Sequence, residues 1–165
     1  MSQRITREEA LARVHHPDGG CWMCTLARAS YAPEDVVVAR DGASVRLDRL
    51  GCTHGHLLVV PEVHETRVEE LPLARYLALQ ALAWEAARAL GAVLSPRRIW
   101  VAALGAPDPL PMSFPHGHLH VVPIHEGGEA ARPARVLTWS EGVVAYEDDE
   151  ARALVLALRE ALRPR

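Results

Sequence analysis

Three histidines alternate with uncharged residues near the middle of the C-terminal half: His116, His118 and His120, followed directly by Val121-Val122. Side chains two apart in a β-strand share a face, so the spacing predicts three imidazoles along one surface, about 7 Å apart. Imidazole is a nucleophile, a general acid–base and a metal ligand near neutral pH. The row by itself therefore allows either a metal site or a reaction centre.

Two further segments carry histidine or cysteine in a pattern. His56 directly precedes the apolar run Leu57-Leu58-Val59-Val60, and His64 follows Pro61 by three residues. Cys21 and Cys24 form a Cys-x-x-Cys pair, and the chain holds three cysteines in total. This usage does not resemble a secreted disulfide framework, which leaves metal binding, a redox pair or free thiols open.

The composition bounds the function. The chain has 165 residues, 49% of them hydrophobic, and a net charge of −3, which favours one domain with a substantial core. All 18 basic residues are arginine and none forms a basic block, which argues against a nucleic-acid or membrane-surface partner. No stretch reads as a transmembrane span or a signal core, so a cytoplasmic location is expected.

Hydrophobic periodicity and turn residues indicate the elements that must position these side chains. Thr6-x-x-Glu9 predicts a capping box opening a helix to Val14, and Asp41-Gly42 predicts a hairpin turn. Further strands are expected at 57–60 and 99–104, and a Pro-rich loop at 105–115. A long helix is expected over 68–90, with Pro72 in its first turn and Gly91 as its C-cap.

Beyond His125, short strands are expected at 136–139 and 143–146, and an amphipathic helix at 151–162. The predicted class is α+β, with a mainly antiparallel sheet of about five strands. The long helix falls between the Gly55–Pro61 segment and the histidine strand. We expect a single domain over 1–165, with a core at about 21–125 and a C-terminal extension at about 126–165 that carries one helix.

The motif His116-x-His118-x-His120-Val121-Val122 resembles the signature of the histidine triad (HIT) family of nucleotide hydrolases and transferases. The segment from Gly55 to His64 is similar to that family's Gly-His-x-Leu-Val-Ile-Pro-x-x-His. The Cys21-x-x-Cys24 pair is found in its zinc-containing branch. All three motifs occur in the family's order, and the resemblance covers roughly 21–125.

The resemblance implies a role for each matching residue. His118 matches the nucleophile, His120 a histidine that contacts the phosphate, and His56 the upstream active-site histidine. Ser113 matches a serine that bonds the phosphate or the leaving group, and Asp48 a carboxylate on the ribose hydroxyls. Neutral imidazole is not repelled by a phosphate, so attack by His118 would give a nucleotidyl-histidine that water can cleave.

The same resemblance implies a zinc ion held by Cys21, Cys24, His64 and His116. Four protein ligands leave no open coordination position, so this zinc would be structural and would tie the N-terminal turn to the catalytic strand. The competing interpretations are a metal bound by all three triad histidines, free or redox-active thiols, and a His64 that is an ordinary surface residue.

The resemblance implies a small-molecule nucleotide substrate, a homodimer, and no nucleic-acid or membrane partner. The leading function is a phosphoanhydride or phosphoramidate hydrolase or transferase. The alternatives are a dinucleoside polyphosphate hydrolase, a nucleotidyl transferase or phosphorylase, and a non-catalytic nucleotide-binding or interaction protein. Two departures bear on this choice: Met112 replaces a common Gln, and Leu104-Gly105-Ala106 lacks a common Asn. His120 also argues against the uridylyltransferase branch, whose triad ends in Gln.

Overall fold

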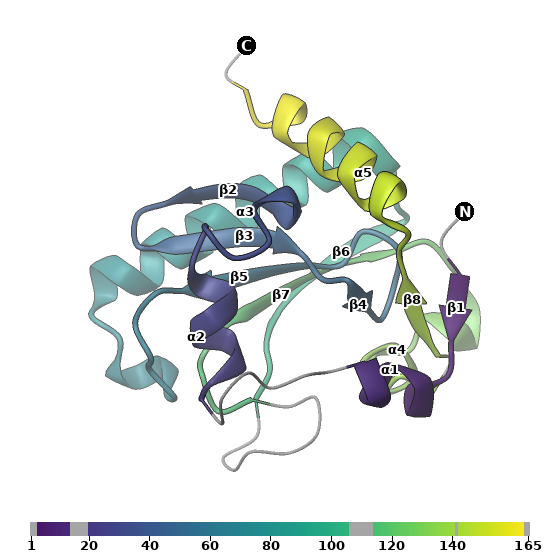
Figure 1. The fold of residues 1–165 in the computed structure, drawn as a ribbon, viewed down its shortest axis with the longest axis horizontal. Helices are drawn as coiled ribbons and strands as arrows, with labels where there is room; N and C mark the ends of the chain where they lie inside the picture. Colours follow the sequence, from purple (N-terminus) through teal and green to yellow (C-terminus); the bar gives the residue numbers. More distant parts are fainter. Residues whose placement is uncertain (1–2, 14–19, 106–113, 141, 164–165) are drawn as a thin grey trace.

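The computed structural model describes residues 3–13, 20–105, 114–140 and 142–163. Its main element is a five-stranded antiparallel sheet in the order β2-β3-β5-β7-β6 (Figure 1). These strands are β2 (Val36–Arg40), β3 (Ala43–Leu47), β5 (Leu57–Pro61), β7 (Leu119–Ile124) and β6 (Arg98–Ala103). The predicted α+β class and the sheet of five strands are confirmed.

The two faces of this sheet bury different partners. Along β5, Leu57 and Val59 belong to a core shared with α3 (Leu73–Leu94) and α5 (Asp148–Ala161). Leu58 and Val60 point the other way and contact residues of α2 (Trp22–Ala27). Because successive strand residues alternate faces, the even-numbered residues of β5 all lie on the α2 side. Figure 1 shows α2 in front of the sheet and α3 behind it.

A second, three-stranded sheet joins the two ends of the chain. Its order is β1 (Gln3–Ile5), β8 (Val143–Ala145) and β4 (Leu50–Gly51), and all pairs are antiparallel. Gly142 enters this sheet with φ +82°, and a Cβ there would lie 2.7 Å from the carbonyl oxygen of Ile5. Only glycine fits such a position without strain. Of this sheet, the sequence patterns predicted β8 alone.

The capping box is confirmed at α1 (Arg7–Arg13). The Thr6 backbone N–H donates to Glu9 Oε2 at 2.7 Å, and the Glu9 N–H donates to Thr6 Oγ1 at 3.2 Å. This reciprocal pair satisfies two of the N–H groups that a helix start leaves unbonded. Val14, the expected end of this helix, lies outside the described residues.

The predicted long helix is confirmed with shifted bounds, and one predicted strand is wrong. The long helix begins at Leu73 rather than at residue 68, after the short 3₁₀ helix η3 (Val68–Glu70), because Pro72 supplies the N-cap. It continues through Gly91 to Leu94, and Ser95 caps it in the left-handed region at φ 47°. Residues 136–139 are not a strand. Pro133 starts the helix α4 (Pro133–Val136), since a proline ring is already set for the first helical turn. Two further 3₁₀ helices are η2 (Pro33–Asp35) and η4 (Gly128–Ala131).

Helix α3 is the one described helix that is long and apolar enough to cross a membrane by length and composition. The core helix of a folded domain passes the same test of length and composition. One side of α3 packs on the central sheet through six buried residues: Leu79, Leu82, Ala83, Ala86, Ala89 and Leu90. The other side carries exposed Leu73, Leu77 and Trp84. The apolar residues of α3 are therefore of two kinds, one buried in the core and the other exposed on the surface.

Candidate functional site

The row of three histidines is split by the fold. Strand β7 begins only at Leu119, because the Gly117 N–H donates to the Glu65 carbonyl at 2.5 Å and the chain bends there. His118 and His120 line a cavity, with ring centroids 4.6 Å apart. His116 is fully buried beside His64, with ring centroids 4.9 Å apart. The expectation that all three imidazoles share one surface is wrong for His116.

Strand register brings His56 and Asp48 to His120. On β5 and β7, Leu58 pairs with His120, and on β3 and β5, Leu47 pairs with Leu57. His56 directly precedes β5 and Asp48 directly follows β3, so both lie at the same end of the sheet. Their parity places them on the α2 face with His120. The Asp48 N–H closes this end by donating to the His56 carbonyl at 2.9 Å.

His118 has one ring nitrogen fixed by the backbone. Its Nδ1 lies 2.7 Å from the carbonyl oxygen of His116, and a carbonyl can only accept, so Nδ1 carries the proton. Burial is the main cause that lowers the pKa of His118, which keeps the ring neutral near pH 7. A neutral ring protonated at Nδ1 leaves the lone pair on Nε2. That nitrogen is available as a nucleophile.

His56 orients His120 from the neighbouring strand. His56 Nε2 lies 3.0 Å from His120 Nδ1. On its other side, His56 Nδ1 is 3.3 Å from the Cys52 backbone nitrogen and 3.2 Å from Asp48 Oδ2. In the neutral ring Nδ1 accepts from the well-aligned Cys52 N–H, so Nε2–H donates to His120. His120 then carries its own proton on Nε2, ready to donate to an anion.

The electrostatics of this pair follow from burial. Desolvation is the main cause that lowers the pKa of His120 to about 2, and the nearby His56 and His118 contribute to this shift. Desolvation also lowers the pKa of His56, whereas the Asp48 carboxylate raises it. Asp48 would thus stabilise the charged form of His56, in which Nδ1 gains a second ring proton and faces the carboxylate. The three imidazoles form a neutral cluster that can donate and accept without repelling an anion.

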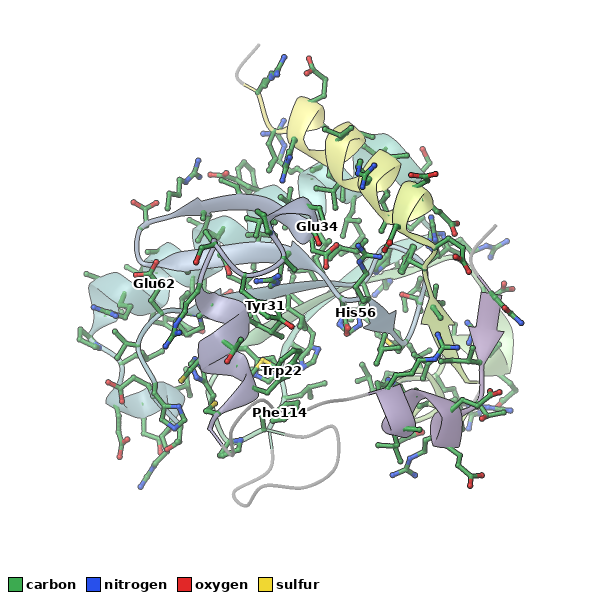
Figure 2. The ribbon with its side chains drawn as sticks, in the orientation of Figure 1. Trp22, Tyr31, Glu34, His56, Glu62 and Phe114 are labelled. Carbon is green, nitrogen blue, oxygen red and sulfur yellow. The ribbon has the colours of Figure 1, made fainter. Side chains whose placement is uncertain are left out.

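The cavity beside these histidines measures about 1020 Å³. One wall is aromatic and apolar: Trp22 packs edge-on against Tyr31, with ring centroids 5.5 Å apart, and Met23 and Leu26 continue the surface. In Figure 2, Trp22, Tyr31 and Phe114 lie along α2, and His56 lies beside β4. The opposite wall includes Arg7, Arg13, Thr138 and Trp139.

Two arginines line the cavity beside the aromatic wall, and Arg46 holds that wall in place. Arg46 is only 1% exposed and donates to the carbonyl oxygens of Leu26, Tyr31 and Ala32. Arg49 donates to the Asp35 carboxylate at 2.6 Å. Burial raises the pKa of Asp35, and the contact with Arg49 partly offsets this by lowering it. A buried charge is tolerated only when such partners replace its water. Sequence reasoning missed both arginines; for Arg46 the available sign was its position among apolar residues just after the hairpin turn at Asp41-Gly42.

A separate cluster joins Cys21, Cys24, His64 and His116, whose ligand atoms all lie within 4.8 Å of one another. His64 Nδ1 is 3.2 Å from Cys24 Sγ, and His116 Nδ1 is 3.4 Å from Cys24 Sγ and 3.6 Å from Cys21 Sγ. Zinc bonds of about 2.0–2.3 Å in a tetrahedron separate ligand atoms by about 3.3–3.8 Å. These four residues could therefore hold a metal ion.

The hydrogen bond on the other ring nitrogen of His116 also suits a metal ligand. Its Nε2 lies 3.0 Å from the Pro61 carbonyl oxygen, so Nε2 carries the proton and Nδ1 keeps a lone pair toward the sulfurs. Burial lowers the pKa of His116 to about 4, which keeps the ring neutral. The sequence-based grouping of these four residues is thus matched by their geometry. Ser113 and Met112 lie outside the described residues.

Comparison with known proteins decides the family. The HIT domain family model matches residues 29–127, which is more than half of the chain. The chain belongs to the HIT domain family. The match contains the HIT histidines and leaves out α1, α2 and the C-terminal helix. No curated protein is similar enough in sequence to this HIT chain to count as a match.

Several solved HIT structures share the fold. A Zn-bound histidine triad family protein from Mycobacterium smegmatis is 23% identical, with a TM-score of 0.58 over 86% of this chain and 97% of its own. A hypothetical histidine triad nucleotide-binding protein from Sulfolobus tokodaii is 17% identical, with a TM-score of 0.63 over 86% and 91%. A histidine triad protein from Bradyrhizobium japonicum is 19% identical, with a TM-score of 0.62 over 87% and 100%. At these identities the likeness shows the fold.

Proposed function

We propose that this protein is a nucleotide-type phosphoanhydride or phosphoramidate hydrolase or transferase that works through a nucleotidyl-histidine. The observation that carries the proposal is His118, whose Nδ1–H is fixed on the His116 carbonyl while its neutral ring faces the cavity. A fixed tautomer with a free Nε2 lone pair is what nucleophilic catalysis requires. Membership of the HIT family supports a nucleotide as the substrate.

In the proposed first step, His118 Nε2 attacks the α-phosphorus and the bond from phosphorus to the leaving group breaks. The leaving group departs with that electron pair and takes up a proton from solvent, and the acceptor gives up a proton to solvent when it attacks in the second step. In the second step, water or another acceptor attacks phosphorus, the P–N bond breaks, and its electron pair returns to Nε2. Dividing one displacement into two lets the same imidazole serve as nucleophile and leaving group.

The neighbouring side chains assist at the phosphate. His120 Nε2–H donates to a phosphate oxygen, and His56 holds His120 in the orientation that points this proton outward. Asp48, at the cavity edge, accepts from the ribose hydroxyls with the carboxylate face that His56 and the Leu50 N–H do not occupy. Ser113 bonds the phosphate or leaving group, as its position before the triad implies.

The four-residue Cys/His cluster is proposed to bind a structural zinc. Two thiolates and two imidazoles close a tetrahedral site, and such a site contributes to folding rather than to the reaction. The Zn-bound Mycobacterium smegmatis neighbour supports this assignment. The zinc would hold α2, which carries the aromatic wall of the cavity, against the residues just before β7.

A homodimer is also proposed. Within the described residues, β6 pairs with β7 alone, so its outer edge is available to another strand. Exposed Leu73, Leu77 and Trp84 on α3 and Val101 on β6 supply apolar surface. Large exposed apolar side chains of this kind are typical of an interface. Two copies related by a two-fold axis would pair these helices and strands.

The test is a trapped intermediate. The protein is mixed rapidly with diadenosine tetraphosphate or adenosine 5′-phosphoramidate, quenched, and examined by intact-protein and peptide mass spectrometry. We expect an adenylyl adduct on His118 and AMP release, both abolished by His118→Ala. Tight nucleotide binding by the wild-type protein without adduct or turnover would instead identify a non-catalytic binding protein. An adduct on another residue would reject the mechanism.

A further inference from the structure

The cavity wall facing α2 is built by segments outside the HIT match. Arg7 and Arg13 come from α1, and Thr138 and Trp139 come from the turn after α4. The family match spans only 29–127, so none of these residues belongs to it. Figure 1 shows α1 and α2 at opposite sides of the region below β4. The chain therefore adds its own wall to a cavity whose base carries the histidines.

This added wall is anchored rather than loose. Strand β1 pairs with β8 through Gln3–Ala145 to Ile5–Val143. Ile5 and Ala10 are buried with Val143, and Trp139 packs against them. The capping box fixes the first turn of α1. Arg7 and Arg13 are thus presented by an arm, residues 3–13, that the C-terminal segment holds against the cavity.

The four arginines at the cavity differ in their partners. Arg46 is bound to three carbonyls, and Arg49 is paired with Asp35 and Asp148. In the part of the chain that the structure describes, neither Arg7 nor Arg13 has an ion pair within 4.0 Å. Glu9 is near Arg13, but its Oε2 already accepts from Thr6.

The walls thus differ in chemistry on either side of the histidines. The aromatic wall suits a base and the Asp48 edge suits a ribose, whereas the arm offers two exposed guanidinium groups. Guanidinium binds phosphate oxygens through paired N–H donors and stays charged at any physiological pH. An amine or ammonia leaving group would gain nothing from such a wall. A leaving group that itself carries phosphate would.

We propose that Arg7 and Arg13 form a subsite for a phosphate-bearing leaving group, so that the preferred substrate is a nucleoside polyphosphate or a dinucleoside polyphosphate. This inference rests on the proposed function. His118 Nε2 bonds to the α-phosphorus, and the bond from that phosphorus to the bridging oxygen breaks. The electron pair leaves on the bridging oxygen of the departing phosphate, whose charge the two arginines stabilise. Water then attacks phosphorus and gives up a proton to solvent, the electron pair of the P–N bond returns to His118 Nε2, and the nucleoside monophosphate leaves.

Binding is measured first, by calorimetry in a His118→Ala background, with AMP, ATP and diadenosine tetraphosphate as probes. We expect ATP or diadenosine tetraphosphate to bind about tenfold or more tightly than AMP, and Arg7→Gln with Arg13→Gln to remove that preference while AMP affinity stays within about twofold. The control is Arg152→Gln with Arg163→Gln, two exposed arginines outside the cavity lining, which removes equal charge and should preserve the preference. A preference unaltered by the arm variant would overturn the subsite.

Turnover is measured next, with the His118 side chain intact. The arm variant should lose about tenfold in kcat/KM on the favoured polyphosphate and keep its rate on adenosine 5′-phosphoramidate. Equal loss on both substrates would show a structural effect and reject the subsite. The ratio of the rates on ATP and on diadenosine tetraphosphate shows whether a nucleoside polyphosphate or a dinucleoside polyphosphate is the preferred substrate. Absence of turnover with an arm-dependent binding preference would reject the catalytic proposal alone, and absence of any nucleotide binding would reject both.

Discussion

At the residue scale, backbone groups decide the proton positions of the histidine cluster. The His116 carbonyl fixes a proton on His118 Nδ1, and the Cys52 N–H leaves the His56 proton on Nε2. Each ring is thereby held in one tautomer without carrying a charge. Burial disfavours the protonated form of all three rings, so the cluster has a cost at low pH that an exposed row of histidines would not have.

This cost predicts a pH dependence of stability. The pKa of His120 is lowered from 6.5 to about 2, so below about pH 6.5 the unfolded chain binds a proton that the folded chain does not. The free energy of unfolding therefore falls as the pH falls through that window. The free energy of unfolding is measured by urea unfolding at about pH 7 and about pH 5. Its decrease between these two pH values should be about 2 kcal/mol smaller for His120→Gln than for the wild-type protein. An identical loss in both proteins would contradict the assignment.

At the element scale, the Cys/His cluster connects three segments that are distant in the chain. Cys21 and Cys24 belong to the start of α2, His64 follows β5, and His116 precedes β7. The apolar contact of α2 with the sheet is small, with Met23 and Ala27 as its buried residues. A helix of six residues is marginal without such anchoring. A bound zinc would therefore contribute much of what keeps α2 in place.

We expect a chelator or Cys24→Ser to lower the Tm of the protein. The loss of a few kcal/mol corresponds to about 5–10 °C for a chain of this size. Differential scanning calorimetry, with zinc measured by elemental analysis before and after chelation, checks this. The chelator should have no further effect on Cys24→Ser, which is the control for nonspecific action. Carefully purified wild-type protein with no zinc and no response to chelator would refute the zinc site.

At the scale of the whole molecule, α3 has an apolar surface on both sides. Its inner side fills the core, whereas Leu73 is 70%, Leu77 56% and Trp84 59% exposed on its outer side. Covering such side chains in a partner is worth about 1.5–3 kcal/mol each. Among the described residues β6 pairs only with β7, and it lies in the same sheet that α3 covers, so one two-fold contact can cover both the strand edge and the helix face.

The dimer is tested by sedimentation equilibrium. The wild-type protein should sediment as a dimer, and Leu77→Glu combined with Trp84→Glu should weaken the dimer Kd by at least about 100-fold. Leu156→Glu is the control, because Leu156 is also an exposed leucine, 54% accessible, but belongs to a different helix, α5. A monomeric wild-type protein, or equal effects of the two variants, would exclude this interface.

The sequence by itself determined the elements whose signals are local and the motifs whose spacing is short. The strand pattern at 57–60, the hairpin turn at Asp41-Gly42 and the capping box at Thr6 each depend on residues within a few positions. The HIT motifs likewise grouped Cys21, Cys24, His64 and His116 before any geometry was available, through their resemblance to a family.

Only the tertiary structure decided what depends on contacts between distant segments. The chain bends at Gly117 because the Gly117 N–H donates to the carbonyl oxygen of Glu65, a residue far back in the chain. This bend turns His116 away from His118. The pairing of β1 with β8 brings α1 to the cavity. No local sequence pattern near Arg7 or Arg13 predicts that these residues line the cavity. Such pairings are set by global packing, since short edge strands carry little hydrophobic periodicity of their own. The three histidines were visible in the sequence; their separate surroundings were not.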